Sequence, residues 1–175
     1  MRYSMVLLVV GCGLCAPPPA YAQSTAWDVA GGYSFMKGRF DGENLHGFVG
    51  SGARYIGWFG LVIEAGANLG KNPVAFRSDL DLVYLSGGAT VVFPGTERCT
   101  PFAQVLLAAV TGASGGNQPP GIGWLATQAG VGADFWHGRN VGLRIGADYL
   151  VSTNAARYNK LRLQVGVVMR RRRAP

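Results

Sequence analysis

Seven charged side chains fall on one face of an alternating pattern, and their types are the ones best suited to chemistry in this chain. Carboxylates and guanidinium groups close together can exchange protons, hold an ion or neutralise one another. Which of these three roles the side chains have depends on where their spacing along the chain places them in the fold. The candidate residues are Asp28, Arg54, Glu64, Asp134, Arg144, Asp148 and Arg162.

The clearest pattern is a hairpin within residues 124–151, with a tight link at residues 137–140. Both arms alternate with period two, which is typical of β-strands. One face is apolar throughout (Phe135 and Leu143, for example), and the other holds glycine and charge (Arg144, for example). Bulky apolar residues on one face and a polar opposite face favour a barrel with lipid outside and a polar interior.

The same alternation predicts six further strands. Each is close to the about nine to eleven residues that a tilted membrane strand needs. The connections alternate in length, with the odd-numbered ones longer, which places both chain ends in the periplasm. We therefore predict an all-β fold, an eight-stranded antiparallel up-and-down transmembrane β-barrel. The six further strands are predicted at residues 27–35, 45–55, 58–69, 81–93, 101–111 and 160–170.

The facing of each strand follows from its parities. The third strand places Leu61 and Ile63 outward and Glu64 inward. For the glycine-rich second strand, the expected outer face carries Val49, Ser51, Ala53 and Tyr55, with Arg54 inside. Aromatic residues near the strand ends are expected to form girdles at both membrane interfaces. These are Trp27, Tyr55, Trp58, Phe93, Phe135 and Trp136 at the periplasmic ends, and Tyr33, Phe35 and Tyr149 toward the outer ends.

The first residues have the pattern of an export signal. Arg2 precedes a short apolar run, and small residues (AYA) stand before Gln23, so residues 1–22 are predicted to be a signal peptide and residues 23–175 the barrel domain. The apolar run is too short to span a membrane as a helix. An alternative is a lipoprotein in which Cys12 is retained and lipidated. If Cys12 is removed, Cys99 is the single thiol of the mature chain.

The formal net charge of +7 does not indicate a nucleic-acid partner, because the basic residues are unevenly distributed. Four of the sixteen are residues 170–173 at the end of the chain, and no basic helix or zinc-ligand spacing is present. This tail is either a solvated end or an attraction to anionic lipid headgroups. Nucleic-acid binding is therefore not expected.

An eight-stranded barrel leaves an interior that side chains just fill. Ionised groups there must be paired, since an isolated buried charge is costly. The seven candidate residues are therefore interpreted as a polar network that plugs the barrel, with inward glycines making room for the long arginines. A narrow proton or ion path is the alternative.

A catalytic site is not expected. Some small outer-membrane barrels modify lipid A with a histidine and a serine. Of the two histidines, His137 falls in a predicted periplasmic turn, and His46 lacks a serine at the required spacing. Two distant histidines and one cysteine form no metal-ligand cluster, so neither a metal nor a cofactor is predicted.

Four segments resemble the small bacterial outer-membrane β-barrel family, the group similar to OmpA, OmpX and opacity-type porins. The resemblance implies outer-membrane localisation, with membrane lipids and the barrel-assembly machinery as partners. One feature departs from the family, whose last strand usually ends in alternating aromatics and Phe, because here Met169 is followed by arginines. The segments are residues 31–34 (GGYS), 101–106 (PFAQVL), 144–149 (RIGADY) and 161–168 (LRLQVGVV).

The function expected from these patterns is a non-catalytic outer-membrane barrel with a plugged interior. Its role would be structural, or an interaction of the outer loops with an unidentified extracellular ligand. The sequence leaves two alternatives open. One is a soluble periplasmic barrel that binds an apolar ligand, which would need the Leu61 and Ile63 face inward. The other is an enzyme that modifies lipid A.

Overall fold

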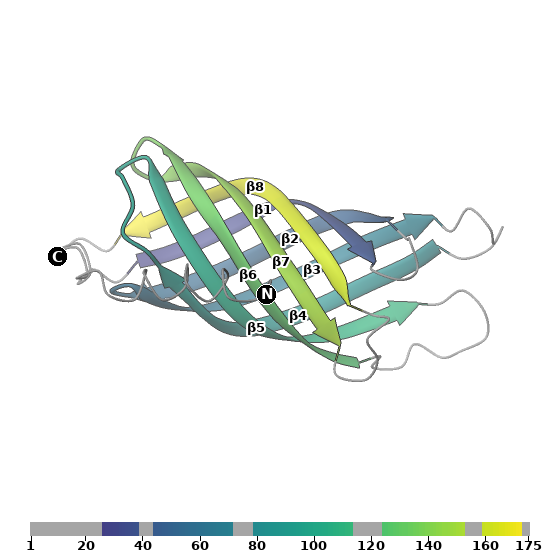
Figure 1. Ribbon diagram of the computed structural model, residues 1–175. Coiled ribbons are helices and arrows are strands. Elements are labelled where there is room, and N and C mark those ends of the chain that lie inside the picture. Colours follow the sequence, from purple (N-terminus) through teal and green to yellow (C-terminus); the bar gives the residue numbers. More distant parts are fainter. Residues whose placement is uncertain (1–25, 39–43, 72–78, 114–123, 153–158, 173–175) are drawn as a thin grey trace, which may run out of the picture.

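The chain folds as a closed β-barrel. The computed structural model describes residues 26–38, 44–71, 79–113, 124–152 and 159–172, so the predicted signal peptide and most of the longer loops lie outside the described residues. Each strand pairs antiparallel with its neighbour in sequence, and β1 closes the ring by pairing with β8 (Figure 1). This confirms the predicted fold class. The strands are β1 (Ala26–Gly38), β2 (Asn44–Ile56), β3 (Phe59–Lys71), β4 (Asp79–Val92), β5 (Cys99–Ala113), β6 (Trp124–His137), β7 (Val141–Ser152) and β8 (Lys160–Arg172).

Three short turns lie at one end of the barrel, where β8 finishes and β1 begins (Figure 1). Gly57 and Gly138 adopt φ values of 68° and 80° in the first and third of these turns, a backbone conformation that glycine adopts without strain. The other four connections join the strands at the opposite end and are longer on average, although the β4–β5 turn (residues 93–98) exceeds residues 39–43 by one residue. This agrees with the predicted alternation and places the short turns on the periplasmic side by the usual rule for bacterial barrels.

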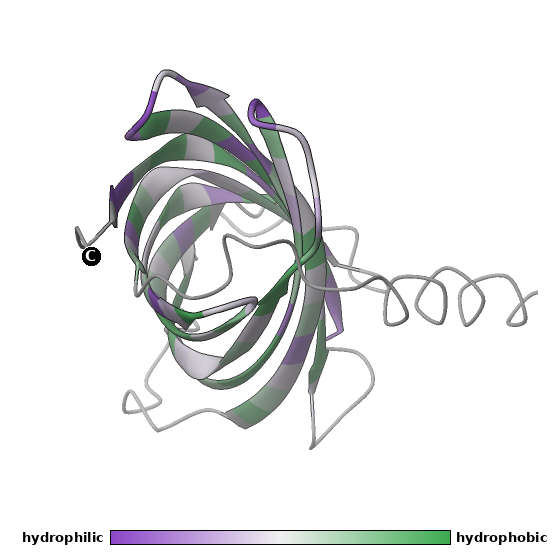
Figure 2. Ribbon diagram, turned by 90° about the vertical axis from the view of Figure 1, so that its left-hand side faces the viewer, coloured by the Kyte–Doolittle hydropathy of each residue, from purple (hydrophilic) through white to green (hydrophobic). Residues whose placement is uncertain are grey.

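The outside of the barrel is apolar. Leu61 and Ile63 are 65% and 68% exposed, while Val62 and Glu64, which alternate with them along β3, are buried. Apolar and polar segments alternate along the strands in Figure 2. Exposing so much apolar surface to water would be strongly unfavourable, whereas contact with the hydrocarbon of a bilayer is favourable. Within the described ranges, no helix has the length and apolarity needed to cross a membrane.

The predicted facing of β2 is wrong. Phe48 is 75% exposed, whereas Val49, Ala53 and Tyr55 are buried and Arg54 points outward. Glycines on both parities of this strand give little hydrophobic contrast, so the sequence pattern left the charge of Arg54 to decide. Inside the barrel, Ala53 and Tyr55 instead pack in an apolar cluster with Val62 of β3 and Leu106 of β5.

The interior contains two apolar layers. Polar side chains lie between these layers and on the side of the short turns. The layer toward the long loops, here called the outer apolar layer, closes the lumen from that side. The layer toward the short turns surrounds Tyr55 and Leu106. The outer apolar layer consists of Met36, Leu45, Leu82, Tyr84, Ala108, Val110 and Ala126.

Candidate functional site

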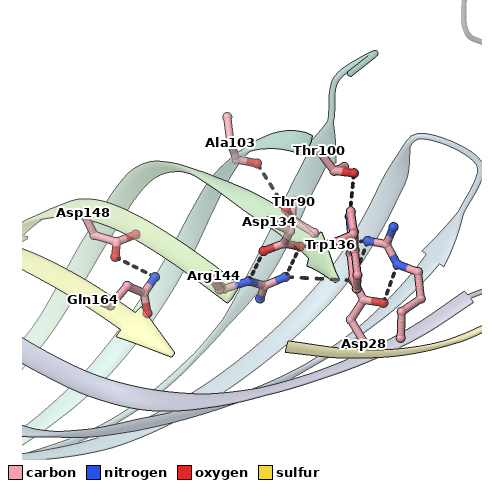
Figure 3. Close-up of polar contacts among 10 residues, drawn as sticks. Asp28, Thr90, Thr100, Ala103, Asp134, Trp136, Arg144, Asp148 and Gln164 are labelled. Atoms are coloured by element: carbon pink, nitrogen blue, oxygen red, sulfur yellow. Dashed lines mark hydrogen bonds and ion pairs between the residues drawn. The ribbon is translucent and has the colours of Figure 1, made fainter. Parts of the chain in front are cut away.

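Two clusters of ion pairs fill the polar interior, and the first lies near the short turns. Arg144 of β7 donates two hydrogen bonds to Asp134 of β6, from Nε to Oδ1 at 2.7 Å and from Nη2 to Oδ2 at 2.8 Å (Figure 3). Arg170 of β8 donates a similar pair to Asp28 of β1, at 2.8 and 2.7 Å. Each arginine also lies within 4.0 Å of the other's carboxylate. The four charges therefore compensate one another.

Arg170 was not predicted as a site residue, although it belongs to the first cluster. The sequence placed it at the start of a basic tail, because the end of β8 could not be read from the alternation. The structure continues β8 to Arg172, and Arg170 lies opposite Asp28 in the β1–β8 register. Its parity with Arg162 and Gln164, two inward residues of the same strand, is the signal that could have identified it.

The second cluster surrounds Arg162 of β8, whose side chain is 0% exposed. Its guanidinium donates to Glu64 of β3 at 2.6 Å, to Asp148 of β7 at 2.7 and 3.1 Å, and to the hydroxyl of Tyr84. Glutamine amides donate to the same carboxylates: Gln104 at 2.8 Å and Gln164 at 3.3 Å to Asp148, and Gln128 at 3.3 Å to Glu64. Figure 3 shows the contact between Gln164 and Asp148.

Four aromatic rings face the three arginines of the interior, of which Arg144 and Arg162 are buried and Arg170 is partly buried. The Cζ atom of Arg170 lies 4.2 Å from the ring of Trp136 and 5.8 Å from that of Tyr55. Arg144 lies over Phe102 at 4.8 Å, and Arg162 over Tyr84 at 5.3 Å. Cations over aromatic faces are stabilised by the ring quadrupole, and more so where water is excluded. Tyr55 and Trp136 therefore contribute to the interior and not to the girdle in which the sequence placed them.

Inward glycines make room for rings and for acceptor groups, and not directly for the arginines as the sequence suggested. A Cβ atom on Gly66 would lie 2.2 Å from the hydroxyl of Tyr84. A Cβ atom on Gly132 would lie 2.5 Å from the ring of Phe102, and one on Gly130 would lie 1.8 Å from Oδ1 of Asp148. Each glycine thus lets a partner of an arginine occupy its place in the lumen.

Of the seven residues predicted for the interior, the structure brings six into the two clusters: Asp28, Glu64, Asp134, Arg144, Asp148 and Arg162. Arg54 is the exception. It lies on the outside near the short turns, with its Cζ atom 5.3 Å from the ring of Trp27. Near a membrane interface an outward arginine is tolerated at little cost, so its charge does not require an inward position.

Little space remains inside. A cavity of about 10 Å³ between the two clusters, lined in part by Ser51, Arg144 and Gln164, is at the lower limit of what one water molecule needs. Toward the long loops, Asn68 and Ser34 are buried with no hydrogen-bond partner for their side chains among the described residues. Most inward side chains of the described strands are buried, so protein atoms occupy most of the lumen there.

The two histidines lie apart from both clusters. His46 faces outward near the long-loop end, where its Nδ1 contacts the hydroxyl of Tyr33 and its ring packs 5.1 Å from that of Phe35. His137 is exposed at the end of β6. No group of three or more His, Cys, Asp and Glu side chains in the described part of the chain could hold a metal ion.

A closed eight-stranded barrel with an apolar exterior and a polar interior is the fold of small bacterial outer-membrane β-barrels. No protein-family model and no curated protein sequence matches the chain significantly. Solved structures do match, at low identity, and show that the fold is shared. The neighbours include several bacterial outer-membrane proteins, which supports the predicted outer-membrane localisation.

Three of these structures match this chain over nearly their whole length. Neisserial surface protein A has a TM-score of 0.67 and 12% identity, over 83% of this chain and 96% of that one. OprG from Pseudomonas aeruginosa has a TM-score of 0.62 and 8% identity, over 85% and 97%. Ail, the attachment invasion locus protein of Yersinia pestis, has a TM-score of 0.59 and 17% identity, over 85% and 100%.

Proposed function

We propose that the chain is a non-catalytic outer-membrane barrel that conducts no ions and presents its outer loops for contact with extracellular partners. The filled interior is the observation that supports this most strongly. Arg162 bridges Glu64 and Asp148 across the lumen, and the outer apolar layer closes the lumen above them. An ion crossing the barrel would have to displace these pairs and then pass an apolar constriction, which disfavours hydrated ions.

The alternative of a soluble barrel with an apolar ligand is disfavoured by the facing of the strands. Such a barrel needs its large apolar side chains around an internal cavity, whereas Leu61, Ile63 and Leu107 are exposed on the outside here. The interior instead holds charged groups that are already paired with one another. An apolar ligand would have to displace these paired charges or the side chains of the two apolar layers.

The surroundings of His46 support a non-catalytic role. A histidine that activates a hydroxyl must lie within hydrogen-bond reach of it. The hydroxyl that His46 contacts is that of Tyr33, and its ring otherwise packs against Phe35. Ser51 is the serine of β2, the strand that also carries His46, and it lines the interior cavity.

A surface role is supported by the arrangement of the loops and by the compared proteins. Four connections join strands at the end opposite the short turns: residues 39–43, 72–78, 114–123 and 153–159. The last three of them are the longest of the barrel. Two of the compared proteins carry surface roles in their names, one as a surface protein and one as an attachment invasion locus protein. The loops are therefore the part proposed to meet a partner.

Single-barrel recording in a planar lipid bilayer tests the non-conducting interior. The refolded wild-type chain is expected to give no stepwise current at moderate voltage, while a large porin in the same apparatus gives open-channel steps. Reproducible unitary currents from the wild-type barrel would refute a closed lumen.

Adherence of a non-adherent Gram-negative host that displays the chain tests the role of the loops. Cells with the wild-type chain are expected to bind immobilised extracellular matrix more than cells in which residues 114–123 are replaced by a short Gly-Ser turn. Equal binding by both, with equal surface display, would contradict a contribution from this loop.

A further inference from the structure

The charges of the barrel are sorted between its two faces. The strand carboxylates whose exposure the structure describes are all buried in the lumen: Asp28, Glu64, Asp134 and Asp148. Among strand residues whose exposure the structure describes, the ionised side chains on the outside are all basic. The membrane-facing surface therefore carries positive charge that the interior carboxylates do not pair with. These exposed basic residues are Lys37, Arg54 and Arg171.

Two of them flank one tryptophan. Trp27 of β1 lies opposite Arg54 in the β1–β2 register and opposite Arg171 in the β1–β8 register. Adjacent strands are about 4.8 Å apart, so the two arginine backbones lie roughly 10 Å apart with the backbone of Trp27 between them. The guanidinium of Arg54 already rests against that ring, with 5.3 Å from Cζ to the ring centre.

Neither arginine is neutralised by an acidic side chain among the described residues, whose ion pairs lie in the lumen. Arg170 provides the contrast, because the residue next to Arg171 points inward and is paired with Asp28. Glu97, an exposed acidic residue at the same end, is in the turn between β4 and β5, on strands that do not adjoin β1. Two guanidinium groups are thus free to bind an anion.

Their position specifies the anion. Trp27 is the second residue of β1, close to the short-turn end, and exposed tryptophan is enriched at the level of lipid headgroups. A planar guanidinium donates two parallel hydrogen bonds to a phosphate. We propose that Arg54, Trp27 and Arg171 form a binding site for the phosphate headgroup of an anionic phospholipid in the periplasmic leaflet. This inference rests on the membrane orientation in the proposed function.

The headgroup should be anionic and not zwitterionic. Two cationic groups attract a lipid with net negative charge, whereas the site supplies no carboxylate to pair with the amine of a zwitterionic headgroup. Trp27 would contribute its ring plane to the glycerol and upper acyl region, and the arginines would bind the phosphate from both sides.

Native mass spectrometry of the full chain in detergent tests the site. The barrel is titrated with phosphatidylglycerol and, separately, with phosphatidylcholine of the same acyl chains. The wild-type barrel is expected to prefer phosphatidylglycerol. Arg54→Gln and Arg171→Gln should each weaken phosphatidylglycerol binding about fivefold, as expected for one basic residue near an anionic lipid, and weaken the binding of phosphatidylcholine, which has no net charge, by less.

Arg98→Gln is the matched control, because it removes the same charge at the same end of the barrel, on the β4–β5 turn. It should leave the preference for phosphatidylglycerol unchanged. An equal loss in this control would overturn the inference in favour of general charge attraction, and so would a double variant of Arg54 and Arg171 that keeps the full preference. Heat-dependent gel migration is measured for every variant: a wild-type chain that forms no barrel contradicts the proposed function, whereas a barrel without lipid preference contradicts this site alone.

Discussion

Arg162 on β8 and Glu64 on β3 form an ion pair across the lumen, with 2.6 Å between Nη1 and Oε1. The two residues belong to strands that are not neighbours in the barrel. Asp148 and Tyr84 complete the contacts of the same guanidinium. One side chain therefore links four strands, and the barrel closes around it.

Arg162→Met should be among the most damaging substitutions in the chain. It would leave Glu64 and Asp148 buried without their cation, which typically costs about 3–5 kcal/mol. The change is measured as the free energy of unfolding in a urea titration in lipid vesicles. A triple variant that also carries Glu64→Gln and Asp148→Asn should recover part of the loss, because no orphaned charge remains. A single variant as stable as the wild type would contradict the network.

Arg170 and Arg171 offer a matched pair of adjacent substitutions. Arg170→Met removes a bidentate partner of Asp28 and should cost about 1.5–3 kcal/mol. Arg171→Met removes an exposed side chain and should change stability by about 0.5 kcal/mol or less. The same unfolding titration compares them. Equal effects would show that Arg170 belongs to an exposed tail and not to the interior.

Gly31 and Gly32 provide a second matched pair, on β1. A Cβ atom on Gly32 would lie 2.2 Å from the carbonyl oxygen of Val165 and 2.4 Å from Cα of Gly166, so β1 and β8 would have to separate. A Cβ atom on Gly31 meets only an ordinary contact, at 3.9 Å. Gly32→Ala should therefore cost about 1–3 kcal/mol and Gly31→Ala much less. The reverse order would contradict the β1–β8 packing.

The facing of β2 can be tested from the lipid side. Phe48→Arg places a charge on an exposed position of the strand and should cost about 2–4 kcal/mol in a bilayer. Asn44→Arg, at the exposed first position of the same strand, should cost about 0–1 kcal/mol because it lies near the interface. Refolding in vesicles measures both. A silent Phe48→Arg would restore the opposite facing.

The sequence was sufficient for the fold wherever the two parities of a strand differ chemically. On β3, Leu61 and Ile63 against Glu64 determine the facing without ambiguity, and β7 is equally clear. On β2, small residues on both parities left the charge of Arg54 as the main guide. That guide failed because an arginine is also stable at a membrane interface, where it can stack on a residue such as Trp27.

The sequence predicted most of the residues that point inward, but not which of them form ion pairs with one another. Parity placed Asp134, Arg144 and Arg162 inward, but contacts across the lumen depend on the tilt of the strands and on their closure. The partnership of Arg170 with Asp28 depends on the pairing of the last strand with the first. No local pattern in the sequence encodes that pairing.

Heat-dependent migration combined with fractionation tests the central claim, a closed barrel in the outer membrane, most directly. The chain is expected in the membrane fraction, released by detergent, and to run at a different apparent mass on a gel before and after boiling. A chain recovered from the soluble periplasm without detergent, with identical migration in both samples, would contradict the account.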